Sequence, residues 1–239
     1  MSPGWRCLAL AALMPLTACK MPLATGAAAD SAQPVGFDLR QVGKSDIDML
    51  ADRNIRANLN DLRRLMAKLY KRNPREWRKT GIAPAGRLTQ LFGGRQTPRL
   101  PELNHQHGLA AMRMAFNPDY PGDRILALIY GLQTMLLAAY NNKTDFYLLD
   151  ELDPQKLHDS ARNVEIAAWK LATGRTPSGD LLILSNAIGP DVQNLSYERL
   201  LSKIIARQDL MSEVVADRTR RTVKSVIQNL ASAIFLPIY

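Results

Sequence analysis

Basic side chains are concentrated between residues 53 and 99, where thirteen lysines and arginines face only two acidic residues, Asp61 and Glu76. Guanidinium groups bind phosphates and carboxylates through paired hydrogen bonds, and a tyrosine and a tryptophan in the same run can stack on a sugar or lie at a lipid headgroup boundary. The pattern predicts an anion-binding surface, with a solvated helix face followed by a basic loop as the alternative. The candidate members are Arg63, Arg64, Lys68, Lys71, Arg72, Arg75, Arg78 and Lys79.

A second polar group lies near the C-terminus, where Asp217, Arg218 and Arg221 interrupt a stripe of apolar residues. Asp217 and Arg221 are spaced i,i+4, which predicts an ion pair on a helix surface that contributes a few tenths of a kcal/mol. A polar site inside the fold, with Arg218 at its centre, is the alternative. Four carboxylates can meet this arginine group, although caps and turns are their simpler role: Asp145, Asp150, Glu151 and Asp153.

The residues with metal-ligating side chains give a weaker signal. Glu102, His105 and His107 offer two imidazoles and a carboxylate, but they lie in a proline-rich segment with no predicted strand to orient both rings. The sequence also lacks the nucleophile elbow, the Ser-x-x-Lys pair, the phosphate-binding loop, the His-Glu-x-x-His helix and the dinucleotide fingerprint. We therefore predict no metal site, no cofactor and no catalytic residue, and a non-enzymatic role is favoured.

Cysteine chemistry is confined to the N-terminus, because Cys7 and Cys19 are the only cysteines in the chain. Arg6 precedes an apolar run over residues 7–16 that is too short to span a bilayer and is typical of a signal peptide. The run ends in Leu16-Thr17-Ala18-Cys19, which resembles the bacterial lipobox. The resemblance implies that residues 1–18 are removed and that Cys19 carries lipid. An ordinary secretory signal with a chance cysteine is the alternative.

The residues after Cys19 indicate a tether and a location. Residues 19–36 are small, contain proline and glycine, and would span roughly 20–25 Å as a flexible coil. Lys20 follows the cysteine, and by resemblance to enterobacterial sorting it implies the outer membrane, with the domain in the periplasm. The formal net charge of +9 favours anionic partners. Besides the membrane itself, these are anionic lipid, lipopolysaccharide, peptidoglycan or an acidic envelope protein, and nucleic acid is in the wrong compartment.

The remainder of the chain, residues 37–239, is predicted to be one all-α domain, a helical bundle with at most one minor β-hairpin. Ser45 to Asp48 has the form of a capping box, and the helix behind it ends at Asn73-Pro74. Apolar spacing predicts the other helices over 74–80, 84–92, 109–116, 123–140, 154–173 and 196–236, the last either continuous or broken near Arg218. The 123–140 segment is apolar nearly all round and is expected to be a buried central helix. The hairpin is expected to pair 146–149 with 180–184.

Four segments are similar to stretches of uncharacterised lipoproteins from pseudomonads and related proteobacteria. They are residues 69–76, 157–164, 215–222 and 235–238. The resemblance covers most of the mature chain and implies an envelope location, but it brings no activity with it.

These observations favour an envelope lipoprotein that acts as a scaffold or adaptor and binds an anionic envelope component or partner protein. Two other functions stay open. One is an enzyme acting on lipid or cell-wall material, with Asp217, Arg218 and His105 near a cleft. The other is an accessory subunit of a transport or secretion complex, in which the 123–140 helix docks into a membrane assembly.

Overall fold

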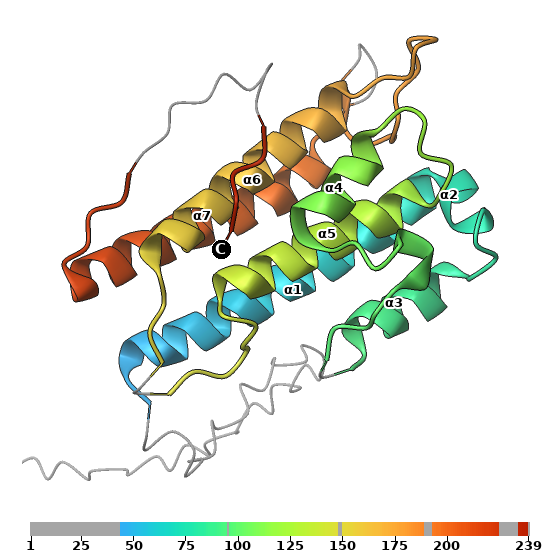
Figure 1. Ribbon diagram of the computed structural model, residues 1–239. Coiled ribbons are helices and arrows are strands. Elements are labelled where there is room, and N and C mark those ends of the chain that lie inside the picture. The colour runs from blue at the N-terminus through green and yellow to red at the C-terminus, as the bar shows by residue number, and fades with distance from the viewer. Residues whose placement is uncertain (1–43, 95, 148–149, 189–192, 225–233, 239) are drawn as a thin grey trace, which may run out of the picture. The chain divides into compact units, whose positions relative to one another are not determined.

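The computed structural model describes residues 44–94, 96–147, 150–188, 193–224 and 234–238, and this part of the chain is an α-helical bundle (Figure 1). The all-α prediction is confirmed. Its elements are α1 (Asp46–Arg72), α2 (Pro74–Arg78), α3 (Pro84–Phe92), a 3-10 turn (Pro101–Leu103), α4 (Gly108–Phe116), α5 (Arg124–Ala139), α6 (Pro154–Thr173), β1 (Ala187–Ile188), β2 (Gln193–Asn194) and α7 (Ser196–Thr219). The predictions for residues 1–36, including lipid on Cys19, lie outside the described residues.

Four long helices form a closed ring of neighbours, in which α1 packs on α7, α7 on α6, α6 on α5 and α5 back on α1 (Figure 1). Helix α4 lies along α5, and α3 packs on α1. Helix α5 is the centre of the core, since every residue of it except Thr134 and Ala138 is buried. The predicted buried central helix is therefore confirmed, and none of the described helices has both the length and the hydrophobicity that a membrane crossing requires.

Local sequence signals account for the helix ends. The Ser45 hydroxyl accepts a hydrogen bond from the Asp48 backbone N–H, while the Asp48 carboxylate accepts one from the Ser45 N–H at 2.8 Å, so the capping box is present. At the other end of α1, the Asn73 side chain donates to the Leu69 and Leu184 carbonyls at 2.9 and 2.8 Å. Proline follows as the first residue of α2. The capping box and Asn73 thus set the length of α1.

Two predictions about secondary structure are wrong. The described part of 146–149 does not pair with 180–184; the two-residue hairpin joins Ala187 to Asn194 instead, and Leu181 bridges Arg175. Of the two alternatives for 196–236, the continuous helix is wrong: α7 ends at Thr219, where Arg220 adopts a left-handed backbone conformation with φ of 53°, close to the predicted break near Arg218. Residues 225–233 lie outside the described part, and beyond them the Ile234 side chain is 74% exposed.

A buried polar layer crosses the middle of the bundle. The Gln208 side-chain carbonyl on α7 accepts hydrogen bonds from Asn58 Nδ2 of α1 at 3.1 Å and from the Tyr140 hydroxyl at 2.9 Å. Its amide nitrogen donates to the Ser160 hydroxyl of α6 at 2.5 Å. These side chains are inaccessible to solvent, so the layer connects α1, α6, α7 and the residue that follows α5. A satisfied polar layer of this kind favours one helix register over others.

Candidate functional site

The charged residues of α1 are sorted by sign between its two faces. Three of its four acidic residues, Asp48, Asp52 and Asp61, are turned into the fold and are at most 8% exposed, and the fourth, Asp46, is exposed in the first turn. Arg207 of α7 donates to Asp61 at 2.7 Å, and Lys44 forms an ion pair with Asp52. Buried carboxylates are stable when they are paired and hydrogen-bonded in this way. The charges of Asp52 and Asp61 are therefore compensated inside the bundle.

Beyond its first two turns, the exposed side of α1 carries charge of one sign. From Arg53 to the end of the helix, every exposed charged side chain is basic. We call this set the cationic face; its members are Arg53, Arg56, Arg63, Arg64, Lys71 and Arg72. Arg53, Arg64 and Lys71 follow one another at intervals of 11 and 7 residues, which aligns them along one side of the helix. Exposed cations in such a row raise the local concentration of anions.

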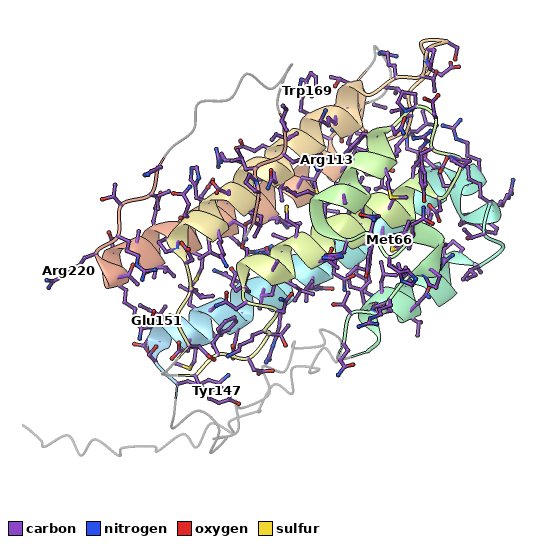
Figure 2. All side chains as sticks on the ribbon, in the orientation of Figure 1. Met66, Arg113, Tyr147, Glu151, Trp169 and Arg220 are labelled. Carbon is purple, nitrogen blue, oxygen red and sulfur yellow. The ribbon has the colours of Figure 1, made fainter. Side chains whose placement is uncertain are left out.

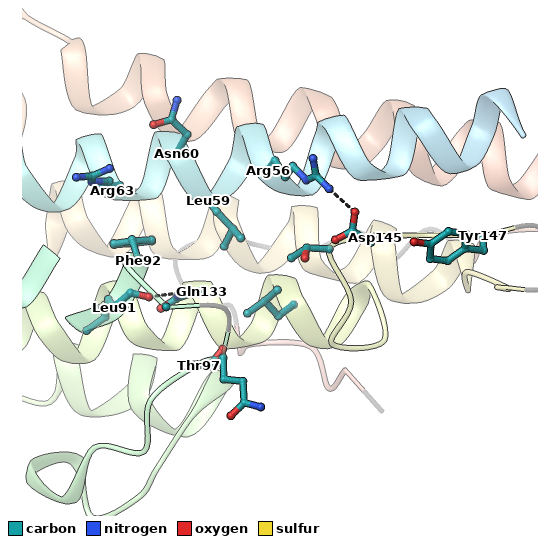
Figure 3. Close-up of a pocket in the computed structure, with 14 residues that line it drawn as sticks. Arg56, Leu59, Asn60, Arg63, Leu91, Phe92, Thr97, Gln133, Asp145 and Tyr147 are labelled. Carbon is teal, nitrogen blue, oxygen red and sulfur yellow. Dashed lines mark hydrogen bonds and ion pairs between the residues drawn. The ribbon is translucent and has the colours of Figure 1, made fainter. Parts of the chain in front are cut away.

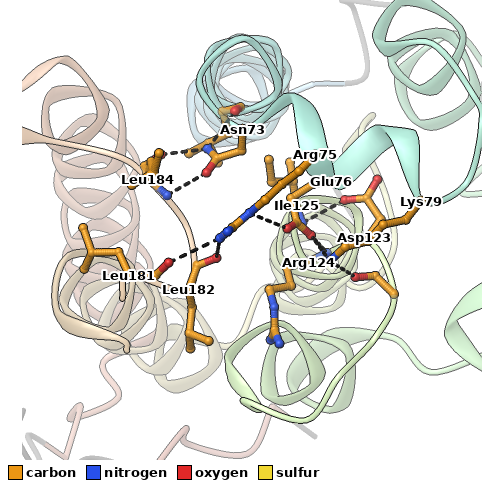
Figure 4. Close-up of polar contacts among 12 residues, drawn as sticks. Asn73, Arg75, Glu76, Lys79, Asp123, Arg124, Ile125, Leu181, Leu182 and Leu184 are labelled. Carbon is orange, nitrogen blue, oxygen red and sulfur yellow. Dashed lines mark hydrogen bonds and ion pairs between the residues drawn. The ribbon is translucent and has the colours of Figure 1, made fainter. Parts of the chain in front are cut away.

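Three of the eight predicted anion-binding residues form hydrogen bonds or ion pairs within the fold, and two of them, Arg75 and Lys79, are exposed as well. Lys68 Nζ donates to the Ser196 hydroxyl at 2.5 Å. The Arg75 guanidinium donates to the Leu182 carbonyl at 3.1 Å, and Lys79 Nζ lies 2.8 Å from a Glu76 carboxylate oxygen (Figure 4). Arg78 lies over the Trp77 ring. The predicted surface thus divides, and its exposed part on α1 is Arg63, Arg64, Lys71 and Arg72.

A buried charge cluster holds the start of α5 against α2 (Figure 4). Glu76 is 1% exposed and accepts from the Arg124 backbone N–H at 2.9 Å in addition to Lys79. Asp123 caps α5 and accepts a hydrogen bond from the Tyr70 hydroxyl at 2.8 Å. Burial raises the pKa of Asp123, although the hydrogen bonds from the Leu126 N–H and Tyr70 oppose the rise. These contacts position the C-terminal end of α1.

A cavity of about 550 Å³ opens beside the cationic face, between α1, α3, α5 and the loop after α5 (Figure 3). Arg56 and Arg63 contribute guanidinium groups to its rim, and Arg56 forms an ion pair with Asp145. Its apolar lining comes mainly from α3 and α5. Its size lies in the range of small-molecule sites. This cavity was not predicted from the sequence, because its walls come from segments far apart along the chain.

The polar group predicted near the C-terminus is not assembled as expected. Arg218 and Arg221 line a hollow together with Asp150 and Glu151, but the contacts of Arg218 are with Ser45, at 3.3 Å, and with Asp48, at 3.9 Å. Figure 2 shows Glu151 across from the end of α7, beyond which Arg220 points outward. Asp217 instead lines a separate hollow between α6 and α7. Arg221 lies beyond the end of α7, and the two side chains form no ion pair within 4 Å, so the helix-surface pair is wrong.

The histidine segment is not arranged as a metal centre. Glu102 forms an ion pair with Arg87. The Arg87 side chain is 1% exposed. His105 has a left-handed backbone conformation with φ of 57° in the loop before α4. No group of three histidine, cysteine, aspartate or glutamate side chains that could hold a metal ion occurs in the part of the chain that the structure describes.

The sequence analysis did not single out two glutamines. Gln208 is the centre of the buried polar layer, and Gln133 lines the cavity. Gln208 falls between Ile204 and Met211 in the apolar stripe of α7, at the position that the 3-4 spacing requires to be buried. That spacing is the signal that could have found it. Gln133 was visible as a polar break in α5, and it lines the cavity. No family model, no curated protein and no solved structure matches this chain.

Proposed function

We propose that this protein is a lipid-anchored envelope protein without catalytic activity, whose cationic face binds the phosphate groups of anionic envelope lipids. The observation that carries the proposal is the sorting of charge on α1. All of its exposed charged residues from Arg53 onward are basic, while Asp61 is buried against Arg207. The lipobox-like sequence before Cys19 supports the location, and the tether of residues 19–36 would keep the domain within reach of the bilayer.

The anchor has its own test. Mass spectrometry of the protein purified from membranes is expected to show a chain that begins at Cys19 and carries acyl groups on that residue. Three acyl chains anchor a protein far more firmly than one, at about 0.8 kcal/mol per buried CH₂. Cys19→Ser is therefore expected to release the protein from the membrane fraction. An unmodified thiol at position 19, or an uncleaved N-terminus, would contradict the lipoprotein proposal.

The binding surface is tested with the processed chain, residues 19–239, carrying Cys19→Ser so that no acyl group contributes. Co-sedimentation with phosphatidylcholine vesicles, with and without phosphatidylglycerol, measures the affinity for anionic headgroups. Basic residues near such a surface contribute about 1 kcal/mol each. The triple substitution Arg53→Gln, Arg64→Gln and Lys71→Gln is therefore expected to weaken binding to anionic vesicles about a hundredfold.

A matched control removes the same charge elsewhere. Arg113 on α4 (Figure 2) and Arg199 and Lys203 on α7 are exposed and form no ion pair within 4 Å in the described residues. Their joint replacement by Gln is expected to leave most of the affinity in place. If the two triple variants lose the same affinity for anionic vesicles, net charge alone accounts for the binding. Absence of binding to anionic vesicles by the unsubstituted chain would overturn the proposal.

A further inference from the structure

Two arginines lie at the rim of the cavity beside the cationic face, and one of them has no ion pair within the described residues. Arg56 and Arg63 both line it and are 7 residues apart on α1, which places them on the same side of that helix (Figure 3). Arg56 is paired with Asp145, whereas Arg63 has no ion pair or side-chain hydrogen bond within the described residues. An exposed guanidinium at the mouth of a cavity offers a two-pronged site for a carboxylate or phosphate.

The lining of the same cavity is mixed, and it combines an apolar patch with one buried amide, Gln133. Leu91, Phe92 and Leu137 contribute its apolar surface. Gln133 is 4% exposed, and its Nε2 donates to the Leu91 carbonyl at 2.9 Å (Figure 3). Its Oε1 has no hydrogen-bond partner in the described residues. Buried acceptors in native proteins are nearly always satisfied by protein or water, so Gln133 Oε1 is an acceptor position at the cavity wall that a bound donor would satisfy.

We propose that this cavity binds a single-chain amphipathic anion that also carries a hydrogen-bond donor next to its charged group. The anionic group pairs with Arg63, the apolar chain lies on Leu91 and Leu137, and the donor reaches Gln133 Oε1. This inference deepens the proposed function and rests on it, because it turns a surface that attracts anionic lipids into one that holds an individual amphiphile. Leu59 completes the apolar wall from α1.

Two probe compounds that differ only in the hydrogen-bond donor measure what the donor contributes to binding. N-dodecanoylglycine and N-dodecanoylsarcosine share chain and carboxylate, but the sarcosine compound carries a methyl group in place of the amide hydrogen. Calorimetric titration of the processed Cys19→Ser chain, below the micelle concentrations, is expected to show binding of the glycine compound and at least about tenfold weaker binding of the sarcosine compound, as expected for one lost hydrogen bond in a buried site.

Substitutions at the cavity then identify the residues. Gln133→Met keeps the side-chain length and removes the acceptor, so it is expected to abolish the preference between the two probes, a ratio that a general loss of stability would not change. Arg63→Gln is expected to weaken the binding of both probes. Asn60→Trp places a ring at the cavity lining and is expected to block the binding of both probes. Ala67→Trp lies two turns further along the same exposed side of α1 and is expected to leave their binding unchanged.

The outcomes distinguish this inference from the proposed function. Arg53, Arg64 and Lys71 do not line the cavity, so their joint replacement is expected to weaken vesicle binding and leave probe binding unchanged. Vesicle binding without probe binding would overturn the cavity proposal alone. Equal binding of the two probes, insensitive to Asn60→Trp, would also overturn it and would assign their binding to the outer surface.

Discussion

Gln208→Leu is expected to lower the free energy of unfolding by about 3 kcal/mol. Leucine has a similar volume, so little cavity is created, but Asn58 Nδ2 and the Tyr140 hydroxyl both lose their acceptor in a site without solvent. Leaving a buried polar group without a partner costs about 1–3 kcal/mol, and two groups are affected here. Urea unfolding followed by circular dichroism gives the value directly.

Two further variants separate the polar layer from general effects on α7. Ser202→Leu introduces the same side chain on the exposed side of α7 and is expected to change stability by less than about 0.5 kcal/mol. Adding Tyr140→Phe to Gln208→Leu removes one orphaned donor, so the double variant should be more stable than additivity predicts. Strict additivity would mean that the Tyr140 and Gln208 side chains do not interact.

Gly131→Ala is expected to destabilise the protein by about 2–3 kcal/mol, although alanine has a higher helix propensity than glycine. Alanine normally stabilises a helix by about 1 kcal/mol relative to glycine. At position 131, however, an added Cβ would lie 2.6 Å from Met112 Cγ and 2.8 Å from both Gly108 O and Met112 N. Two of these atoms are backbone, so α4 must move away from α5, and overpacking of this kind typically costs about 1–3 kcal/mol or more.

Gly86→Ala on α3 is the matched control. The Cβ there would meet only the end of the Ile82 side chain, at 3.3 Å, which can move aside. Helix propensity should then decide the sign, and the variant is expected to be as stable as the parent or slightly more stable. Thermal unfolding of both variants tests the pair, and a Gly131→Ala protein with an unchanged midpoint would refute the tight contact between α4 and α5.

Short-range signals predicted most of the helices. The capping box at Ser45, the Asn73-Pro74 end and the Asp153 cap each depend on atoms within a few residues, and the structure confirms all three. The end of α7 was predicted only as one of two alternatives. Apolar residues recur on both sides of Arg220, and the spacing alone does not reveal that this residue leaves the helical conformation.

The candidate site was predicted only in part. The sequence shows that basic residues dominate the 53–99 segment, but their use depends on neighbours far along the chain. Lys68 contacts Ser196, and Arg75 contacts the carbonyls of 181 and 182, so part of the hydrogen-bonding capacity of each side chain is used within the fold. The cavity is less predictable still, because α1, α3 and α5 contribute its walls jointly.

Residue types at short spacing were enough to predict the helical class, the helix starts, the basic character of the first helix and the lipobox-like N-terminus. Which charges face solvent depends on contacts between distant parts of the chain. Asp61 is neutralised by Arg207, 146 residues away, and Gln208 is buried because it meets Asn58 and Tyr140. Such pairings form when distant helices pack together, and a polar side chain is buried where packing supplies its hydrogen-bond partners.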